Sequence, residues 1–204
     1  MKADWIAPKR TAVLVIDCQV DFGAPDGEMA KRGADMTAPQ AALEKAQALV
    51  EAARAASVEV VFVRLITNSA AESAVIHEAR VRQGEEGPEL CLEGTHGAEF
   101  IGPQPLPGDI IISKKRYSAF VHTGLAEELH AKGVDTLVLA GLTTECCVAS
   151  SAWDGFEQDF HVLIAEDACA AYEQDLHRHA LKALAASGAV VADTATFINL
   201  WKMQ

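Results

Sequence analysis

Six short runs of apolar residues, rich in β-branched types, are spaced along the chain, and each ends at polar residues or glycine. They cover residues 11–16, 58–66, 109–113, 136–140, 161–165 and 189–192. Apolar runs of this length, with few polar interruptions, are typical of strands that helices cover on both faces. The pattern therefore predicts six buried strands.

Stretches with apolar residues at helical spacing separate these runs. In the first stretch one helix face carries Leu43, Ala46, Leu49 and Val50. The predicted helices cover residues 38–56, 123–132, 147–158 and 176–186. This alternation predicts an α/β fold of three layers: a doubly wound, mostly parallel six-stranded sheet with helices on both sides. We expect residues 1–204 to form one domain, with its functional site outside the carboxyl ends of the strands.

Two segments interrupt the alternation, residues 23–34 and residues 68–108. Both are rich in Gly, Pro, Glu and other polar residues, and the second is too long for an ordinary connection in a compact domain. Long loops usually carry function, so we interpret the two segments as walls or lids of a pocket.

The composition excludes several classes of partner. The formal net charge is −12 and residues 114–116 form the one basic run, so a nucleic-acid partner is not expected. No stretch reaches the roughly 20 apolar residues of a membrane helix, and the first residues do not resemble a signal peptide. The five cysteines form no C-x-x-C pair, and their odd number argues against a disulfide framework. We expect a cytoplasmic protein that has no membrane partner and binds a small molecule.

Reactive side chains gather where the parallel strands are expected to end. Asp17 follows the first strand, Lys114 follows the third, and Cys146 and Cys147 lie past the fourth, at the start of a helix. The free N–H groups and the dipole of a helix N-terminus favour a thiolate, the nucleophilic form of cysteine. A carboxylate, an ammonium and a thiol on adjacent strands can carry out nucleophilic catalysis. The alternatives are structural: the cysteines could be small buried residues, Asp17 could cap a turn, and Lys114 could be a solvated charge.

Four segments together resemble a known family. They read V-I-D-C-Q-V-D-F at residues 15–22, C-L-E-G-T-H-G-A at 91–98, S-K-K-R-Y-S-A-F at 113–120 and G-L-T-T-E-C-C-V at 141–148. In this order they resemble the isochorismatase-like cysteine hydrolases, a superfamily that includes nicotinamidase, N-carbamoylsarcosine amidohydrolase and ureidoacrylate amidohydrolase. The resemblance implies the doubly wound fold expected above and a homo-oligomer, either a homodimer or a homotetramer.

The resemblance also implies a role for each reactive residue. Asp17 falls on the family's general base, Lys114 on its lysine, and Cys147, directly before valine in the G-x-x-T-x-x-C-V pattern, on its nucleophile. It implies a cis peptide between Leu142 and Thr143, and an oxyanion hole made by the backbone N–H groups of Thr143 and Cys147. The implied reaction is acyl transfer through a thioester, which needs no cofactor.

The same resemblance narrows the substrate. Isochorismatases proper lack the nucleophilic cysteine, so Cys147 favours a hydrolase of C–N bonds. Nicotinamidases carry a metal site where this chain has residues 65–68 and Leu90, which argues against a metal and against nicotinamidase activity. We expect a cysteine-dependent amidohydrolase that cleaves a small amide, carbamoyl or ureido compound, with a nicotinamidase-type amidase as the alternative.

Five further residues are candidate contacts for the substrate. Arg64, at the end of the second strand, could hold a carboxylate bidentately, which favours a carboxylated ureido or carbamoyl compound. The others are Gln19, Phe22, Tyr117 and His122. A surface position for Arg64 and a core position for the aromatic residues are the structural alternatives.

Two other functions stay open. A nucleotide- or flavin-binding oxidoreductase of similar fold is disfavoured because no G-x-G-x-x-G follows the first strand. A catalytically silent binding or scaffold protein is disfavoured by the intact set of Asp17, Lys114 and Cys147. If Cys147 were structural, its thiol would react no faster than an ordinary buried thiol.

Overall fold

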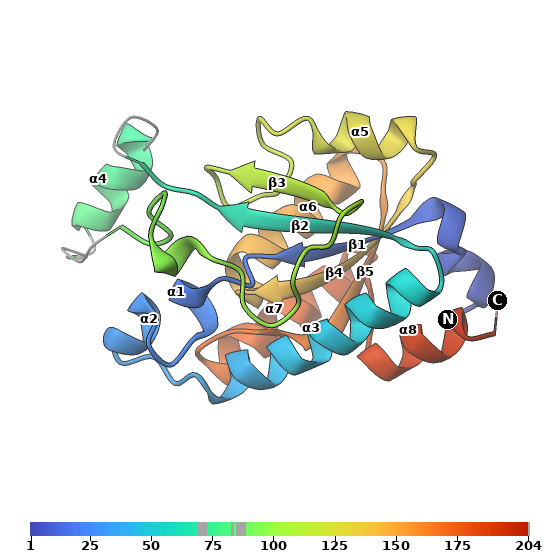
Figure 1. Cartoon of the computed structure of the whole chain (residues 1–204), viewed down its shortest axis with the longest axis horizontal. Helices are drawn as coiled ribbons and strands as arrows, with labels where there is room; N and C mark the ends of the chain where they lie inside the picture. Colours follow the sequence, from blue (N-terminus) through green and yellow to red (C-terminus); the bar gives the residue numbers. More distant parts are fainter. Residues whose placement is uncertain (69–72, 83, 85–88, 204) are drawn as a thin grey trace.

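The computed structural model describes residues 1–68, 73–82, 84 and 89–203. Within these residues one six-stranded sheet runs through the molecule, and all of its strand pairings are parallel (Figure 1). The strand order β3-β2-β1-β4-β5-β6 reverses direction between β1 and β4. The strands are β1 (Thr11–Ile16), β2 (Glu59–Leu65), β3 (Ile110–Lys114), β4 (Thr136–Leu142), β5 (His161–Ala170) and β6 (Val190–Ala192). The predicted doubly wound sheet is confirmed.

Helices cover both faces of this sheet (Figure 1). One face packs against α3 (Thr37–Ala55) and α8 (Thr194–Trp201). The other face packs against α5 (Leu125–Ala131), α6 (Ala149–Glu157) and α7 (Gln174–Ala186). The four predicted helices are thus present with small shifts of their ends. The apolar pattern missed α8, and β5 continues to Ala170 instead of ending at residue 165.

Successive residues of a strand belong to different cores. Leu14 and Val63 pack under α5, α6 and α7, whereas Val15 and Phe62 pack under α3 and α8. This is the alternation that a pleated strand imposes, because its side chains point to opposite faces in turn. The same alternation decides which strand-end residues can meet.

Glycine is required where β1 and β4 meet. Gly141 has a φ of 128°, and a Cβ atom there would overlap the carbonyl oxygen of Ile16, its partner in the parallel ladder. A larger residue would push the two strands apart at the reversal of the strand order. Gly141 therefore keeps the ends of β1 and β4 close together.

The two segments predicted as loops contain short helices. Residues 23–34 hold α2 (Glu28–Lys31), which follows α1 (Val20–Gly23). The segment 68–108 holds α4 (Ala74–Arg82) and the 3-10 turn η3 (His96–Ala98); residues 69–72, 83 and 85–88 of it lie outside the described residues. The apolar pattern did not predict α4, because no residue of this helix is buried and it carries no apolar stripe.

Two more 3-10 turns precede the sheet, η1 (Ala3–Ile6) and η2 (Pro8–Arg10). In the part of the chain that the structure describes, no helix combines the length and the apolar character needed to cross a membrane.

Candidate active site

The three predicted catalytic side chains come from segments whose carboxyl ends meet. Asp17 directly follows β1, Lys114 ends β3, and Cys147 lies in η4 (Thr144–Val148), a π-helical turn that leads from β4 into α6. The expectation that their strands are adjacent was wrong for β3, because β2 separates it from β1. The long side chain of Lys114 spans β2 and brings its ammonium to the other two groups.

The ammonium of Lys114 contacts both of the other candidate catalytic groups. Its Nζ lies 2.8 Å from Oδ2 of Asp17 and 3.4 Å from Sγ of Cys147. It also donates a hydrogen bond to the backbone carbonyl of Arg116 at 3.0 Å. The side chains of Asp17 and Lys114 are both 0% exposed. Buried charges persist when they are paired, so the two groups depend on each other.

Burial and pairing set the protonation of this pair. Burial raises the pKa of Asp17 above the ordinary value for aspartate, and the charge of Lys114 only partly offsets this. Burial alone would lower the pKa of Lys114, but the charges and hydrogen bonds of Asp17 and Cys147 together outweigh burial and the pKa is raised. Lys114 therefore stays charged at neutral pH, and Asp17 becomes a stronger base than an exposed aspartate.

Cys147 rests as a thiol. Its hydrogen bond with Cys146, its burial and the negative charge of Asp17 raise its pKa, although Lys114 acts in the opposite direction. For Cys147 this direction runs against the expectation that the helix N-terminus favours a thiolate. Burial beside a carboxylate disfavours a second negative charge more than the start of α6 favours it. The thiol needs a base, and Asp17 is the adjacent carboxylate.

The turn before Cys147 has the expected backbone. The Leu142–Thr143 peptide bond is cis. The Thr143 carbonyl accepts hydrogen bonds from the backbone N–H groups of Cys146 at 3.2 Å and Val148 at 3.1 Å. The Thr143 hydroxyl donates to Oε1 of Glu145 at 2.8 Å. These bonds hold Thr143 and Cys147 in the wall of one cavity.

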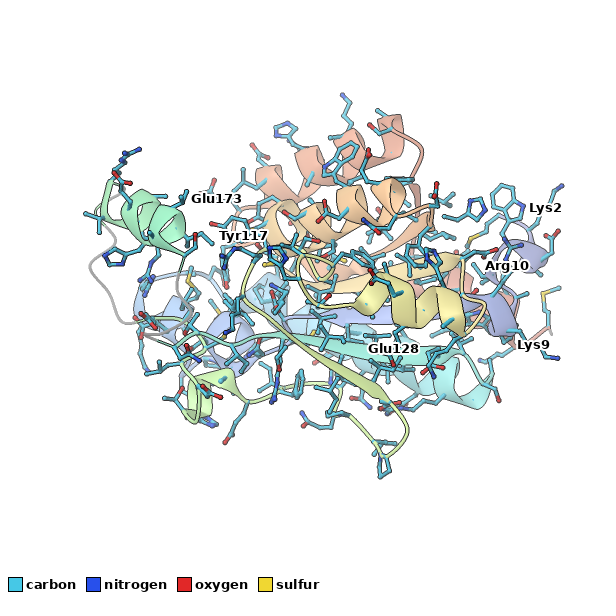
Figure 2. The ribbon with its side chains drawn as sticks, turned by 90° about the horizontal axis from the view of Figure 1, so that it is seen from above. Lys2, Lys9, Arg10, Tyr117, Glu128 and Glu173 are labelled. Carbon is cyan, nitrogen blue, oxygen red and sulfur yellow. The ribbon has the colours of Figure 1, made fainter. Side chains whose placement is uncertain are left out.

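That cavity, the catalytic cavity, has a volume of about 470 Å³ and opens beside α4. Its wall includes Cys147, Thr143 and two of the predicted substrate contacts, Phe22 and Tyr117. Figure 2 shows Tyr117 near the end of the molecule that carries α4, far from Lys2 and Arg10. The volume is within the range of about 300–1,000 Å³ found for small-molecule sites.

Three other predicted contacts do not line the catalytic cavity. Arg64 lines a neighbouring cavity of about 400 Å³, donates a hydrogen bond to Oγ of Ser113 at 3.0 Å, and lies over the ring of Phe100. Gln19 is fully buried and its amide hydrogen-bonds the backbone groups of Leu65 and Ala98, at 2.8–2.9 Å. His122 is exposed. The amide of Gln19 ties the end of β2 to η3.

Asp21 is a polar residue that sequence reasoning missed. Its carboxylate accepts hydrogen bonds from the backbone N–H groups of Cys91 at 2.7 Å and Glu28 at 3.1 Å. It thereby ties together the two long segments that supply the cavity wall. The signal was available: an aspartate between Val20 and Phe22, in an apolar context, indicates a buried carboxylate with fixed donors.

Side chains that can bind a metal ion do not form a cluster in the described part of the chain. Among residues 1–68, 73–82, 84 and 89–203, no group of three or more His, Cys, Asp or Glu side chains is arranged to hold a metal ion. The positions discussed for a metal in nicotinamidases include Leu65, Ile66 and Leu90, and these three line the catalytic cavity with apolar side chains.

Comparison with known proteins agrees with this geometry. The isochorismatase domain family matches residues 11–196. The chain belongs to the isochorismatase family. A ureidoacrylate amidohydrolase, RutB, of Acinetobacter baylyi is 30% identical over 214 residues, which covers 98% of this chain and 87% of that protein.

Solved structures of the family share the fold. A cysteine hydrolase from Pseudomonas syringae pv. phaseolicola superposes with a TM-score of 0.83 at 27% identity, over 96% of this chain and 94% of that one. An N-carbamoylsarcosine amidase from Thermoplasma acidophilum superposes with a TM-score of 0.70 at 25% identity, over 91% of this chain and 96% of that one. The resemblance read from the four sequence segments is confirmed.

Proposed function

We propose that Cys147, Asp17 and Lys114 are the catalytic residues with which this family member, a hydrolase of C–N bonds, cleaves a small amide, carbamoyl or ureido substrate. The observation that carries the proposal is the contact of one ammonium with both other groups. Lys114 Nζ lies 2.8 Å from Asp17 and 3.4 Å from Cys147, and Cys147 faces the catalytic cavity.

The first half of the reaction forms a thioester. Asp17 takes the proton of the Cys147 thiol, and the thiolate attacks the carbonyl carbon of the substrate. Backbone N–H groups of Thr143 and Cys147 donate hydrogen bonds to the oxyanion that develops. Lys114 stabilises the thiolate and keeps the carboxylate in place. Ammonia or an amine then leaves with the proton held by Asp17.

The second half releases the acyl group. Asp17 takes a proton from water, which attacks the thioester and regenerates the Cys147 thiol. All proton transfers pass through one carboxylate, and no redox change occurs. The raised pKa of Asp17 suits both halves, because a base works best when its pKa lies closer to the working pH.

The test is ammonia release from a panel of small compounds. The panel contains 3-ureidoacrylate, N-carbamoyl amino acids and nicotinamide, each assayed with wild type and with Cys147→Ala. Release that disappears in the variant supports the proposal and identifies the substrate class, and turnover of nicotinamide alone would select the nicotinamidase-type alternative. If the variant keeps the wild-type rate, the nucleophile assignment is wrong. Silence throughout, with Cys147 as unreactive to iodoacetamide as a buried structural thiol, would favour a silent scaffold.

Location and assembly remain part of this proposal. We propose a cytoplasmic protein that forms a homodimer or homotetramer, on the strength of the cysteine pattern and the family resemblance. Light scattering of the purified chain measures the assembly, and a monomer at micromolar concentration would contradict it.

A further inference from the structure

The backbone of the turn that carries Cys147 is held by bonds of its own. The carbonyl of Thr143 accepts hydrogen bonds from the N–H groups of Cys146 and Val148. The two N–H groups of the proposed oxyanion hole come from Thr143, directly before η4, and Cys147, within it. The geometry of the hole is therefore set by this turn, and a π-helical turn is an uncommon conformation that is often found at functional sites.

The side chain of Thr144 has different surroundings from those of its neighbours. Thr143 and Glu145 line the catalytic cavity, whereas Thr144 is not among the described residues of its wall. Thr144 is 0% exposed, and its hydroxyl forms a hydrogen bond of 2.8 Å with Nδ1 of His177. The Thr144 side chain thus points away from the cavity and towards α7.

This hydrogen bond anchors the turn on a packed helix. Leu181 and Leu184 of α7 belong to the core on this face of the sheet. His177 lies four residues before Leu181, so the two side chains are neighbours on one face of the helix. A buried hydroxyl needs a hydrogen-bond partner, and the ring of His177 supplies it for Thr144. The start of η4 is therefore tied to a helix whose place is fixed by burial.

The ring of His177 is neutral at neutral pH. Burial lowers the pKa of His177, although the negative charge of Glu145 acts in the opposite direction. A neutral imidazole pairs with a hydroxyl through Nδ1 in either tautomer, because a hydroxyl is both a donor and an acceptor. His177 is not among the described residues of the cavity wall. Its bond holds Thr144, and its ring is not placed to touch a substrate.

We infer that His177 is a positioning residue for the proposed reaction, which holds the hydroxyl of Thr144 and thereby fixes the turn that presents the oxyanion hole. The inference rests on the proposed function and adds a residue that acts through the backbone. Small displacements matter at such a site, because a misplacement of about 1 Å can lower a rate by about 100-fold.

The first test removes the bond on the side of α7. For the substrate found in the panel, His177→Leu should lower kcat by about 10- to 100-fold with KM within about threefold of wild type, because the oxyanion hole acts in the transition state. His177→Asn should restore kcat to within about threefold of wild type, since its amide places a hydrogen-bonding group at the position of Nδ1. His179→Leu is the matched control, because His179 is exposed and lies on another side of α7.

The second test removes the bond on the side of the turn. Thr144→Val keeps the shape of the side chain but loses the hydroxyl, and it should lower kcat as His177→Leu does. Thr144→Ser keeps the hydroxyl and should lower kcat by less than Thr144→Val. If His177→Leu does not fold in urea denaturation controls, Thr144→Val carries the same prediction.

Combining the two substitutions shows whether they act through one bond. The double variant with Thr144→Val and His177→Leu should have about the kcat of either single variant, because both changes remove the same interaction. Losses that multiply would mean that the two residues act independently, and they would overturn the inference.

A third measurement separates the oxyanion hole from the thiol. Iodoacetamide alkylates Cys147 without forming an oxyanion, so the alkylation rate reports on the thiol alone. In His177→Leu this rate should stay within about threefold of wild type while kcat falls. An equal fall of both rates would mean that His177 acts on the thiol and not on the hole, which would overturn the inference.

Failure of the inference is distinct from failure of the proposed function. A wild-type kcat in His177→Leu, or a loss that His177→Asn does not restore, would overturn the inference while Cys147-dependent turnover still stands. Turnover that survives Cys147→Ala would overturn the proposed function.

Discussion

Two cavities flank the ends of β2 and β3 and share wall residues, yet they have different contents. Both are bordered by Ile66, Lys114 and Lys115. The catalytic cavity holds Cys147, whereas its neighbour, the Arg64 cavity, holds Arg64 and Ser113. The comparison shows that residues at the same edge of a sheet need not share a site.

The alternation of side chains along β2 and β3 explains why the two cavities have different contents. Arg64 pairs with Ser113 and Leu65 with Lys114 in the parallel ladder of β2 and β3. Because side chains alternate, each pair projects from one face of the sheet. Arg64 follows Phe62 onto the α3 face, and Lys114 lies on the face of Cys147. The alternation of side chains along β2 can be read from the sequence. It would have placed Arg64 on the face of the sheet opposite to Lys114.

The largest expected effect distinguishes the two cysteines of the catalytic cavity. Cys147→Ala should lower kcat by about 10⁴-fold, because the thioester cannot form. Cys146→Ala should stay within about threefold of wild type, since the ammonium of Lys114 contacts the sulfur of Cys147, while Cys146 lines the cavity and is not the attacking thiol. Steady-state ammonia release measures both. Equal losses of kcat in the two variants would contradict the assignment of Cys147 as the nucleophile.

Asp17→Asn should lower kcat by about 10²- to 10⁴-fold, because the thiol and the water lose their base. In wild type the base works only when it is deprotonated, and burial raises the pKa of Asp17. The acid limb of kcat/KM should therefore lie above the value of about 4 for an exposed aspartate. A pH profile with its acid limb at or below that value would contradict the assignment.

Substitutions of the neighbouring residues Lys114 and Lys115 should have different effects on the stability of the protein. Lys114→Met leaves Asp17 buried without its partner and should reduce the free energy of unfolding by about 3–5 kcal/mol. Lys115 is exposed, so Lys115→Met should change it by no more than about 0.5 kcal/mol. Urea denaturation gives both values. A similar small change in both variants would mean that the ion pair does not support the fold.

The smallest expected effect belongs to the Arg64 cavity. Arg64→Gln should leave kcat/KM for the substrate found in the panel within about twofold of wild type, because a change outside the catalytic cavity has little effect. A loss of about tenfold or more would show that the two cavities act as one binding site.

The sheet and the positions of the three candidate catalytic residues could be predicted from the sequence for a physical reason. Parallel strands buried on both faces give continuous apolar runs, and the residues that end them are then placed by topology alone. Asp17 and Lys114 are such residues, and Cys147 lies in η4, the turn that follows β4. The resemblance was still needed to choose Cys147 over Cys146, because apolar pattern does not separate two neighbouring thiols.

The residues of the cavity wall were harder to predict from the sequence, because they come from segments without a periodic apolar pattern. Arg32, directly after α2, and Arg80 on α4 line the cavity because of the path that the two long segments take. That path depends on tertiary contacts, such as those of Asp21 with Glu28 and Cys91. Hydrogen bonds between one side chain and distant backbone groups produce no periodic pattern in the sequence.

The most direct test of the central claim is the mass of the protein during turnover. Wild type and Cys146→Ala, quenched in acid while they hydrolyse a substrate found in the panel, should carry the acyl group of that substrate, and fragmentation should place it on Cys147. The adduct should be absent from Cys147→Ala. An adduct on another residue, or full turnover by Cys147→Ala without any adduct, would contradict the account.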